Sequence, residues 1–239
     1  NMDYFNFPDY TAQGYVIARG VFTAAEAAAM AAHYMQVSAA GPHPGDFAGV
    51  PTRSTQAAAE PLARYPRLIN MHNWDAQTRA WMCDQRLVDS VSALFGQPAR
   101  VLQTMVYFKP PGSRGQSMHQ DNLYLRTTPV AAAWVALDRA DAENGAMEML
   151  RGSHLLGLLP CQRADTDLSF TDSETVAPPW LERDLIALEP GDVVFFHGLT
   201  VHGSPPNHTA DRFRRSFIVH YVGETAYPIV GPTLPRDEG

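Results

Sequence analysis

The chain has 239 residues, of which 45% are hydrophobic and 18% charged, and its formal net charge at pH 7 is -7. This composition is typical of a folded globular protein and excludes a disordered, fibrous or coiled-coil chain. The acidic balance disfavours nucleic acid or an anionic membrane as the main partner, because both select for a concentrated basic surface. We therefore expect a small-molecule partner.

The sequence gives no sign of export or of a membrane anchor. Cys83 and Cys161 are the only cysteines, too few for a disulfide framework or a thiolate zinc site. No stretch approaches the roughly 18 consecutive apolar residues of a membrane span, and the first residues lack the basic and apolar regions of a signal peptide. A reducing cytoplasmic location without a membrane span is the expectation.

The first predicted elements are a strand and a helix. Residues 14–22 (GYVIARGVF) are rich in β-branched and aromatic residues, which is typical of a short strand. Thr23 and Glu26 then form a capping-box pattern before an Ala- and Met-rich run that favours helix. Residues 39–74 are rich in Pro and Gly and predict a long loop, a kind of segment that often serves as a lid.

The hydrophobic period changes from helical to alternating in the middle of the chain. Apolar residues at helical spacing before Gly96 predict a second helix. The later alternating segments predict short antiparallel strands without helical crossovers between them, so the fold is mostly β with N-terminal helices, a sandwich or barrel in one domain over 1–239. These strands are expected at 100–110, 130–137, 146–150, 193–197 and 214–222, with a long loop at 161–184.

The segment SMHQDNLYLR (117–126) places a histidine and a carboxylate two residues apart. In an extended strand alternate side chains share a face, so His119 and Asp121 are expected to point to the same side. This pair is a weak pattern by itself, but His202, after the predicted strand 193–197, supplies a third candidate ligand. Two imidazoles and one carboxylate on one face of a metal leave coordination positions open, as in non-haem Fe(II) oxygenases.

A cation and a hydroxyl follow the third candidate ligand. Such oxygenases need an electron-donating co-substrate, and 2-oxoglutarate can chelate iron through its keto-acid end while its distal carboxylate seeks a cation. Arg214 lies twelve residues after His202 and could pair with that carboxylate through both arms of its guanidinium group. Ser204 could add a hydroxyl donor, and Arg215 is the neighbouring alternative to Arg214.

With these residues the sequence resembles the phytanoyl-CoA dioxygenase (PhyH-like) family of Fe(II)- and 2-oxoglutarate-dependent oxygenases. The resemblance spans about residues 8–222 and is carried by GYVIARGVFT, the His119-x-Asp121 pair, AWVAL with ENGAMEMLRGSH, EPGDVVFFHGLTVHGS, and Arg214 with SFIVHY. It implies a double-stranded β-helix, a cupin-like jelly roll, over core strands 100–222. It also implies Fe(II), 2-oxoglutarate and O2 as cofactor and co-substrates.

The resemblance assigns roles to individual residues. It implies that Fe(II) is bound by His119, Asp121 and His202. The distal carboxylate of 2-oxoglutarate would be held by Arg214 and Ser204. The presence of Asp121 implies oxygen chemistry and not chlorination, because halogenating relatives replace this carboxylate with a small residue.

Further residues are candidates for the walls of the pocket. Trp134 corresponds to a family tryptophan near the co-substrate, while Gln103 and Tyr107 lie on a strand that usually lines the pocket. His72 could reach the substrate from the first long loop, and Arg163 could contribute a lid wall from the second. For these last two residues a structural role within the loop is the competing interpretation.

The predicted function is oxidation, by hydroxylation, of an unactivated C–H bond in a small molecule, with release of succinate and CO2. Secondary metabolism would suit such an enzyme. One alternative is a cupin-like metal-dependent isomerase or hydrolase, which would need no counterpart to Arg214. A second alternative is a ligand-binding jelly roll without catalytic activity.

Overall fold

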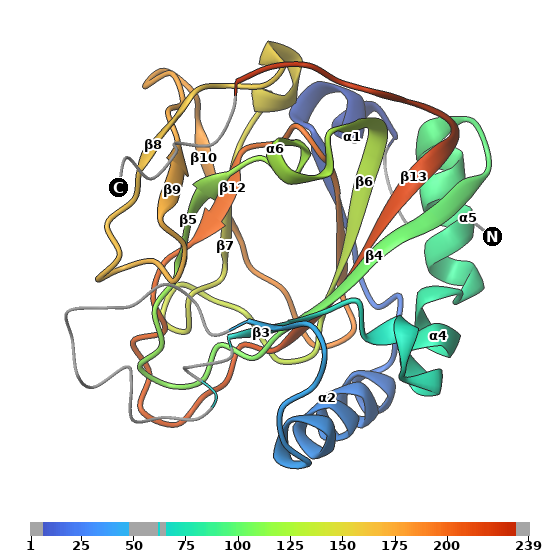
Figure 1. Cartoon of the computed structure of the whole chain (residues 1–239), viewed down its shortest axis with the longest axis vertical. Helices are drawn as coiled ribbons and strands as arrows, with labels where there is room; N and C mark the ends of the chain where they lie inside the picture. The colour runs from blue at the N-terminus through green and yellow to red at the C-terminus, as the bar shows by residue number, and fades with distance from the viewer. Residues whose placement is uncertain (1–6, 48–61, 63–65, 233–239) are drawn as a thin grey trace.

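Two antiparallel sheets pack against each other and form a jelly roll (Figure 1). The computed structural model describes residues 7–47, 62 and 66–232. The strands are β1 (Tyr15–Ala18), β2 (Asp46–Phe47), β3 (Arg67–Ile69), β4 (Ala99–Tyr107), β5 (Gln116–His119), β6 (Thr127–Ala136), β7 (Met147–Leu150), β8 (Cys161–Arg163), β9 (Ser173–Thr175), β10 (Arg183–Ile186), β11 (Val193–His197), β12 (His202–Ser204) and β13 (Ser216–Pro228).

The larger sheet contains seven strands in the order β1-β11-β6-β13-β4-β3-β2, and the smaller sheet contains four in the order β10-β7-β12-β5. Strands β8 and β9 form a separate hairpin. The helices are α1 (Phe7–Gln13), α2 (Ala24–Ala39), α4 (Ala76–Met82), α5 (Gln85–Phe95) and α6 (Asn122–Leu125), with the 3-10 turns η2 (Met71–Asn73) and η3 (Ser153–Leu156). Within the described part of the chain, no helix combines the length and apolar character needed to cross a membrane.

The larger sheet is covered on both faces, which explains the continuous apolar runs in its central strands. Figure 1 shows α2, α4 and α5 along the outside of β4, β6 and β13, while the smaller sheet lies on the other side. Side chains alternate between these two environments. The outer core includes Ala131, Ala133, Val135, Phe217 and Val219, and the inner core includes Ala132, Trp134, Ala136 and Ile218.

The two predicted long helices are confirmed together with their boundary signals. At the start of α2 the Glu26 backbone N–H donates to Thr23 Oγ1 (3.2 Å), and the Thr23 N–H donates to Glu26 Oε2 (2.7 Å). Helix α5 ends at Gly96, whose φ of 63° is the left-handed conformation that glycine adopts without a Cβ clash. Local sequence therefore sets the start of α2 and the end of α5.

Both segments that the sequence predicts as long loops contain strands. The segment 39–74 includes β2 and β3, and its residues 48–61 and 63–65 lie outside the described residues. The segment 161–184 contains the β8–β9 hairpin and the beginning of β10. These strands have only two to four residues each, too few for an alternating pattern to be recognised.

The outer core gives a direct test of this packing. Phe217 on β13 is fully buried and its ring stacks on Tyr34 of α2, with 5.8 Å between ring centroids. We expect Phe217→Ala to lower the free energy of unfolding by about 3–5 kcal/mol, because it leaves a cavity between sheet and helices. Urea denaturation would measure this change. Tyr227→Ala, at a position 62% exposed on the same strand, should cost less than about 1 kcal/mol, and equal losses would contradict the packing.

Candidate metal centre

Three side chains that could bind a metal ion meet between the two sheets. His119, Asp121 and His202 each offer one ligand atom, and these atoms lie within 4.8 Å of one another. Asp121 Oδ1 is 3.6 Å from Nε2 of both histidines. The three residues are only 6 to 9% exposed. The cluster therefore has the composition and the shielding from water of a metal centre.

Pairing between β5 and β12 brings the two histidines together. His119 and His202 are direct cross-strand partners in this antiparallel pair, and their ring centroids are 4.2 Å apart. Side chains directly opposite each other in such a pair lie on the same face of the sheet. The two imidazoles, 83 positions apart in sequence, consequently point into the same space.

Asp121 reaches the site by a different route from the one expected. Strand β5 ends at His119, and Asp121 has helical dihedral angles (φ -58°, ψ -33°) immediately before α6. The explanation by strand alternation is therefore wrong, although the carboxylate does lie beside the histidine. The turn is held by the fully buried Gln120, whose side-chain amide donates to the carbonyls of Gly157 (2.8 Å) and Leu199 (2.7 Å).

The protonation of the cluster suits a metal ion. His119 Nδ1 lies 2.9 Å from the carbonyl of Ser117, and His202 Nδ1 lies 3.0 Å from the carbonyl of Thr200. A carbonyl oxygen can only accept, so each Nδ1 carries the proton and each Nε2 keeps its lone pair. Burial, and next the charge of His202, lower the pKa of His119 to about 3. His119 is therefore neutral near pH 7, as a metal ligand must be.

The carboxylate of Asp121 is held in one orientation by a fourth residue. Burial alone would raise the pKa of Asp121, but His202, His220 and His119 together hold it well below its ordinary value. His220, 3% exposed on β13, lies with Nε2 2.8 Å from Asp121 Oδ2. Because Oδ2 is occupied by His220, Oδ1 is the oxygen that faces the two histidines. His220 therefore supports a candidate metal ligand through a buried hydrogen bond.

Two cavities meet at this cluster. The first extends toward Trp134, Ser204 and Arg214, and the second extends toward Gln103 and Tyr124. The residues that line both cavities are Met105, Tyr107, Gln116, His119, Asp121 and His220. A metal ion bound here would have space for a ligand on each of two sides.

The structure distinguishes the two neighbouring arginines. Arg215 donates from Nε and Nη2 to the two carboxylate oxygens of Asp138, at 2.8 and 2.7 Å. Arg214 is 3% exposed, lines the first cavity and lies with its guanidinium carbon 5.1 Å from the centroid of the Trp134 ring. Burial lowers the pKa of Arg214 to about 10, and among the described residues its Nε has no hydrogen-bond partner. A buried cation of this kind is costly in free energy unless it is paired, so an anionic ligand would stabilise it.

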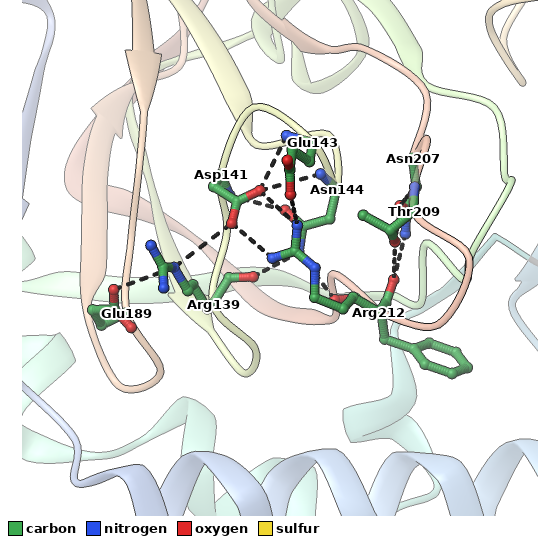
Figure 2. Close-up of polar contacts among 9 residues, drawn as sticks. Arg139, Asp141, Glu143, Asn144, Glu189, Asn207, Thr209 and Arg212 are labelled. Carbon is green, nitrogen blue, oxygen red and sulfur yellow. Dashed lines mark hydrogen bonds and ion pairs between the residues drawn. The ribbon is translucent and has the colours of Figure 1, made fainter.

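A polar network fixes the backbone just before Arg214 (Figure 2). The Arg212 guanidinium donates to both carboxylate oxygens of Asp141, at 2.7 and 3.2 Å. The amide of Asn144 donates to the backbone carbonyl of Phe213 at 3.2 Å. These contacts tie the backbone just before Arg214 to the turn between β6 and β7, while the guanidinium group itself lies against Trp134.

The other residues expected at the site divide into two groups. Ser204 and Trp134 line the first cavity with Arg214, and Tyr107 lies at the boundary of both cavities. Gln103 lines the second cavity and not the first, so it lies on the side away from Arg214.

The structure does not bring His72 or Arg163 to either cavity. His72 Nδ1 lies 2.8 Å from Thr104 Oγ1. Thr104 alternates along β4 with Met105, which faces the inner core, so its side chain points to the helix-covered face. Arg163 is exposed on β8 and pairs there with Ser173 of β9. The interpretation as loop residues with structural roles fits both positions.

Two residues at the site are missed by the sequence patterns. Gln116 lies with Nε2 3.2 Å from His119 Nε2, and the amine of Lys109 donates to Ser204 Oγ at 2.8 Å. Nothing in the local sequence marks Gln116. Lys109 could have been noticed, because it is the only lysine in the chain.

Comparison with known proteins agrees with this geometry. Residues 10–216 match the family model described as Phytanoyl-CoA dioxygenase (PhyH). The chain is 31% identical over 155 residues to the "Probable phytanoyl-CoA dioxygenase" of Caenorhabditis elegans. The alignment covers 58% of this chain and 48% of that protein. It is 27% identical over 172 residues to the "Probable alpha-ketoglutarate-dependent hypophosphite dioxygenase" of Stutzerimonas stutzeri, covering 69% and 59%. The chain thus spans about half the length of the curated relatives it matches.

The fold is also that of a solved protein. A structure described as the epimerase SnoN in complex with Fe3+, alpha ketoglutarate and nogalamycin RO superposes with a TM-score of 0.74. The sequence identity is 22%, and the alignment covers 97% of this chain and 94% of SnoN. This likeness confirms the predicted jelly roll. Because the family model extends over most of the sequence, the chain belongs to the phytanoyl-CoA dioxygenase (PhyH) family.

Proposed function

We propose that this protein is an Fe(II)- and 2-oxoglutarate-dependent dioxygenase that hydroxylates an unactivated C–H bond of a small molecule. One observation carries the proposal: two imidazoles and one carboxylate converge where two cavities meet, and the first cavity also contains the buried Arg214. A metal-dependent isomerase or hydrolase would have no use for this cation. The names of the two curated relatives, both dioxygenases, support the same reaction class.

The donor set fits ferrous iron. His119 and His202 present unprotonated Nε2 atoms, the first of them 3.2 Å from the Gln116 amide, and Asp121 presents Oδ1, so two nitrogens and one oxygen would hold the ion and leave positions for further ligands. When bound, iron with 2-oxoglutarate and dioxygen supplies the oxidising power that breaks the C–H bond and releases succinate and CO2. His220 keeps the second oxygen of Asp121 hydrogen-bonded and so limits the carboxylate to one ligand atom.

The first cavity suits 2-oxoglutarate. We assign its distal carboxylate to Arg214 and Ser204, because these two polar side chains line the same cavity as the candidate metal ligands. The face of Trp134 would keep the guanidinium in place. The apolar side chains of Phe196 and Ile218 line the same cavity and would cover the methylene carbons.

The second cavity is left for the substrate. Tyr107 lies at the boundary of the two cavities, and its hydroxyl accepts a hydrogen bond from Arg67 Nη1 at 3.2 Å. Gln103 offers an amide to the second cavity, so we assign it to the substrate and not to the co-substrate. His119 and Asp121, which line this cavity, are at most 9% exposed. A substrate bound beside them would therefore be shielded from water at the reacting carbon. A small metabolite fits this arrangement, and SnoN, which is described from nogalamycin biosynthesis, makes secondary metabolism a reasonable source.

The reaction class can be tested without knowing the substrate. We expect anaerobically Fe(II)-loaded protein to consume O2 and convert 2-oxoglutarate to succinate slowly on exposure to air, because such sites turn over without substrate at a low rate. An oxygen electrode and chromatographic detection of succinate would measure this. Protein kept free of metal should make no succinate. Binding of Fe(II) and 2-oxoglutarate without any succinate would contradict the proposed reaction.

The metal assignment predicts the effect of removing one ligand. We expect His202→Ala to weaken binding of Mn(II), a redox-stable substitute for Fe(II), by about 100-fold or more, because even residues that only support metal ligands are worth 10- to 100-fold. Titration calorimetry would measure the dissociation constant. His208→Ala, at an exposed position, is the matched control and should bind Mn(II) like the unchanged chain. Equal affinity in both variants would exclude His202 as a ligand.

The assignment of the co-substrate predicts different effects for adjacent arginines. We expect Arg214→Ala to raise the dissociation constant of 2-oxoglutarate by about 30-fold or more, because a buried carboxylate loses its charged partner. Arg215→Ala breaks the pair with Asp138 outside the cavity and should lower the melting temperature with little change in 2-oxoglutarate affinity. Calorimetry on the Mn(II)-loaded variants separates the two effects. The reverse pattern would transfer the role to Arg215.

A further inference from the structure

The only lysine of the chain is buried next to the proposed carboxylate site. Seventeen of the 18 basic residues are arginines, and the remaining one, Lys109, is 4% exposed. Buried lysines are rare unless they are paired. Among the described residues, the amine of Lys109 makes a single side-chain hydrogen bond, to Ser204 Oγ at 2.8 Å. Burial, and next the charge of Arg214, hold the pKa of this amine well below its ordinary value.

The surrounding backbone is shaped around this side chain. Gly145 has a φ of 77°, and a Cβ there would lie 2.5 Å from Lys109 Cε. A larger residue would therefore displace the amine. Lys109 itself has a φ of 35°, which is uncommon outside glycine. Its carbonyl accepts from the backbone N–H of Arg214 (3.1 Å) and from the amide of Asn207 (3.2 Å).

One residue thus contacts both groups assigned to the distal carboxylate. The carbonyl of Lys109 holds the backbone of Arg214, and its amine holds the hydroxyl oxygen of Ser204. A serine hydroxyl has one proton and two lone pairs. Because the Ser204 oxygen accepts from the amine, its own O–H is directed to another acceptor, and Ser204 lines the first cavity. This holds whether the amine is charged or neutral, since both forms can donate.

We propose that Lys109 is a positioning residue for 2-oxoglutarate, which acts through Ser204. The amine would fix the Ser204 hydroxyl so that its proton points to the distal carboxylate bound by Arg214. The inference rests on the proposed function, because it takes the carboxylate in the first cavity to be that of 2-oxoglutarate. In this proposal Lys109 influences the binding of 2-oxoglutarate without contacting the metal ligands or the co-substrate.

A double-mutant cycle tests action through Ser204. The variants are Lys109→Met, which keeps the unbranched chain up to Cε but has no amine to donate, Ser204→Ala, and the two combined. We expect each single change to raise the dissociation constant of 2-oxoglutarate for Mn(II)-loaded protein by about 10-fold, because a hydrogen bond to a charged group is lost. The combined variant should bind no more weakly than Ser204→Ala alone. Independent effects, in which the two losses multiply, would overturn the proposal.

Two controls accompany the cycle. Arg114→Met changes a basic residue on the loop after β4, outside both cavities, and should leave 2-oxoglutarate affinity unchanged. Pyruvate is a 2-oxo acid without a distal carboxylate, so its affinity should be the same for the unchanged chain and for Lys109→Met. A loss of pyruvate binding in Lys109→Met would show a general disturbance of the site and contradict a role confined to the distal carboxylate.

The single lysine allows a second measurement on the unchanged chain. Protein labelled with 13Cε-lysine should give one lysine side-chain signal in a carbon–proton NMR spectrum, and diamagnetic Zn(II) can fill the metal site. We expect 2-oxoglutarate to shift this signal and pyruvate to leave it in place. This result does not depend on any variant folding. Binding of 2-oxoglutarate by calorimetry without a shift would overturn the proposal.

The outcomes separate the two levels of inference. If the metal-loaded, unchanged chain does not bind 2-oxoglutarate, the proposed function fails and the role of Lys109 fails with it. If the unchanged chain binds 2-oxoglutarate and folded Lys109→Met binds it equally well, only the role of Lys109 fails.

Discussion

The whole site depends on the register between two short strands. His119 on β5 lies directly opposite His202 on β12, and β12 is also paired with β7 on its other side. A shift of either strand by one residue would turn one imidazole to the opposite face of the sheet. The chain before β12 is accordingly fixed: the Thr200 hydroxyl donates to the carbonyl of Gly14, and the Val201 N–H donates to Ser153 Oγ, both at 2.8 Å. Strand β12, which has only three residues, is thus stabilised by contacts with distant parts of the chain.

The distribution of buried charge follows from the same architecture. The inner core is mostly apolar, yet the charged residues Asp121, Arg214 and Lys109 are also buried, each at most 9% exposed. Such groups cost free energy unless they find partners. Asp121 is compensated by the surrounding histidines, whereas among the described residues Arg214 makes no direct ion pair and the Asp138 carboxylate acts on it only from a longer distance. This difference supports the proposal that the end of the first cavity binds an anion.

The sequence predicts long, regular elements better than short ones. The helix beginning after Thr23 and the helix ending at Gly96 are marked by capping residues, and strands such as β6 and β11 have enough residues to show their character. Strands β8, β9 and β12 have three residues each and show no period. The same limit applies to the site. Residue type and spacing indicate His119, Asp121 and His202, but the turn that carries Asp121 and the contacts of Lys109 and His220 depend on neighbours far away in the sequence.

The sequence by itself determined the fold class, because hydrophobic period and capping are local to each segment. The resemblance of its motifs to a known family indicated the family and the three candidate ligands. Only the tertiary structure decided which of two adjacent arginines faces the cavity, that Gln103 lies on the side away from Arg214, and that His72 is on the far face of the sheet. The physical reason is that the direction of a side chain is set by the strand pairing and turns around it. Those contacts join residues far apart in the sequence, such as Asp121 and His220, which are 99 positions apart.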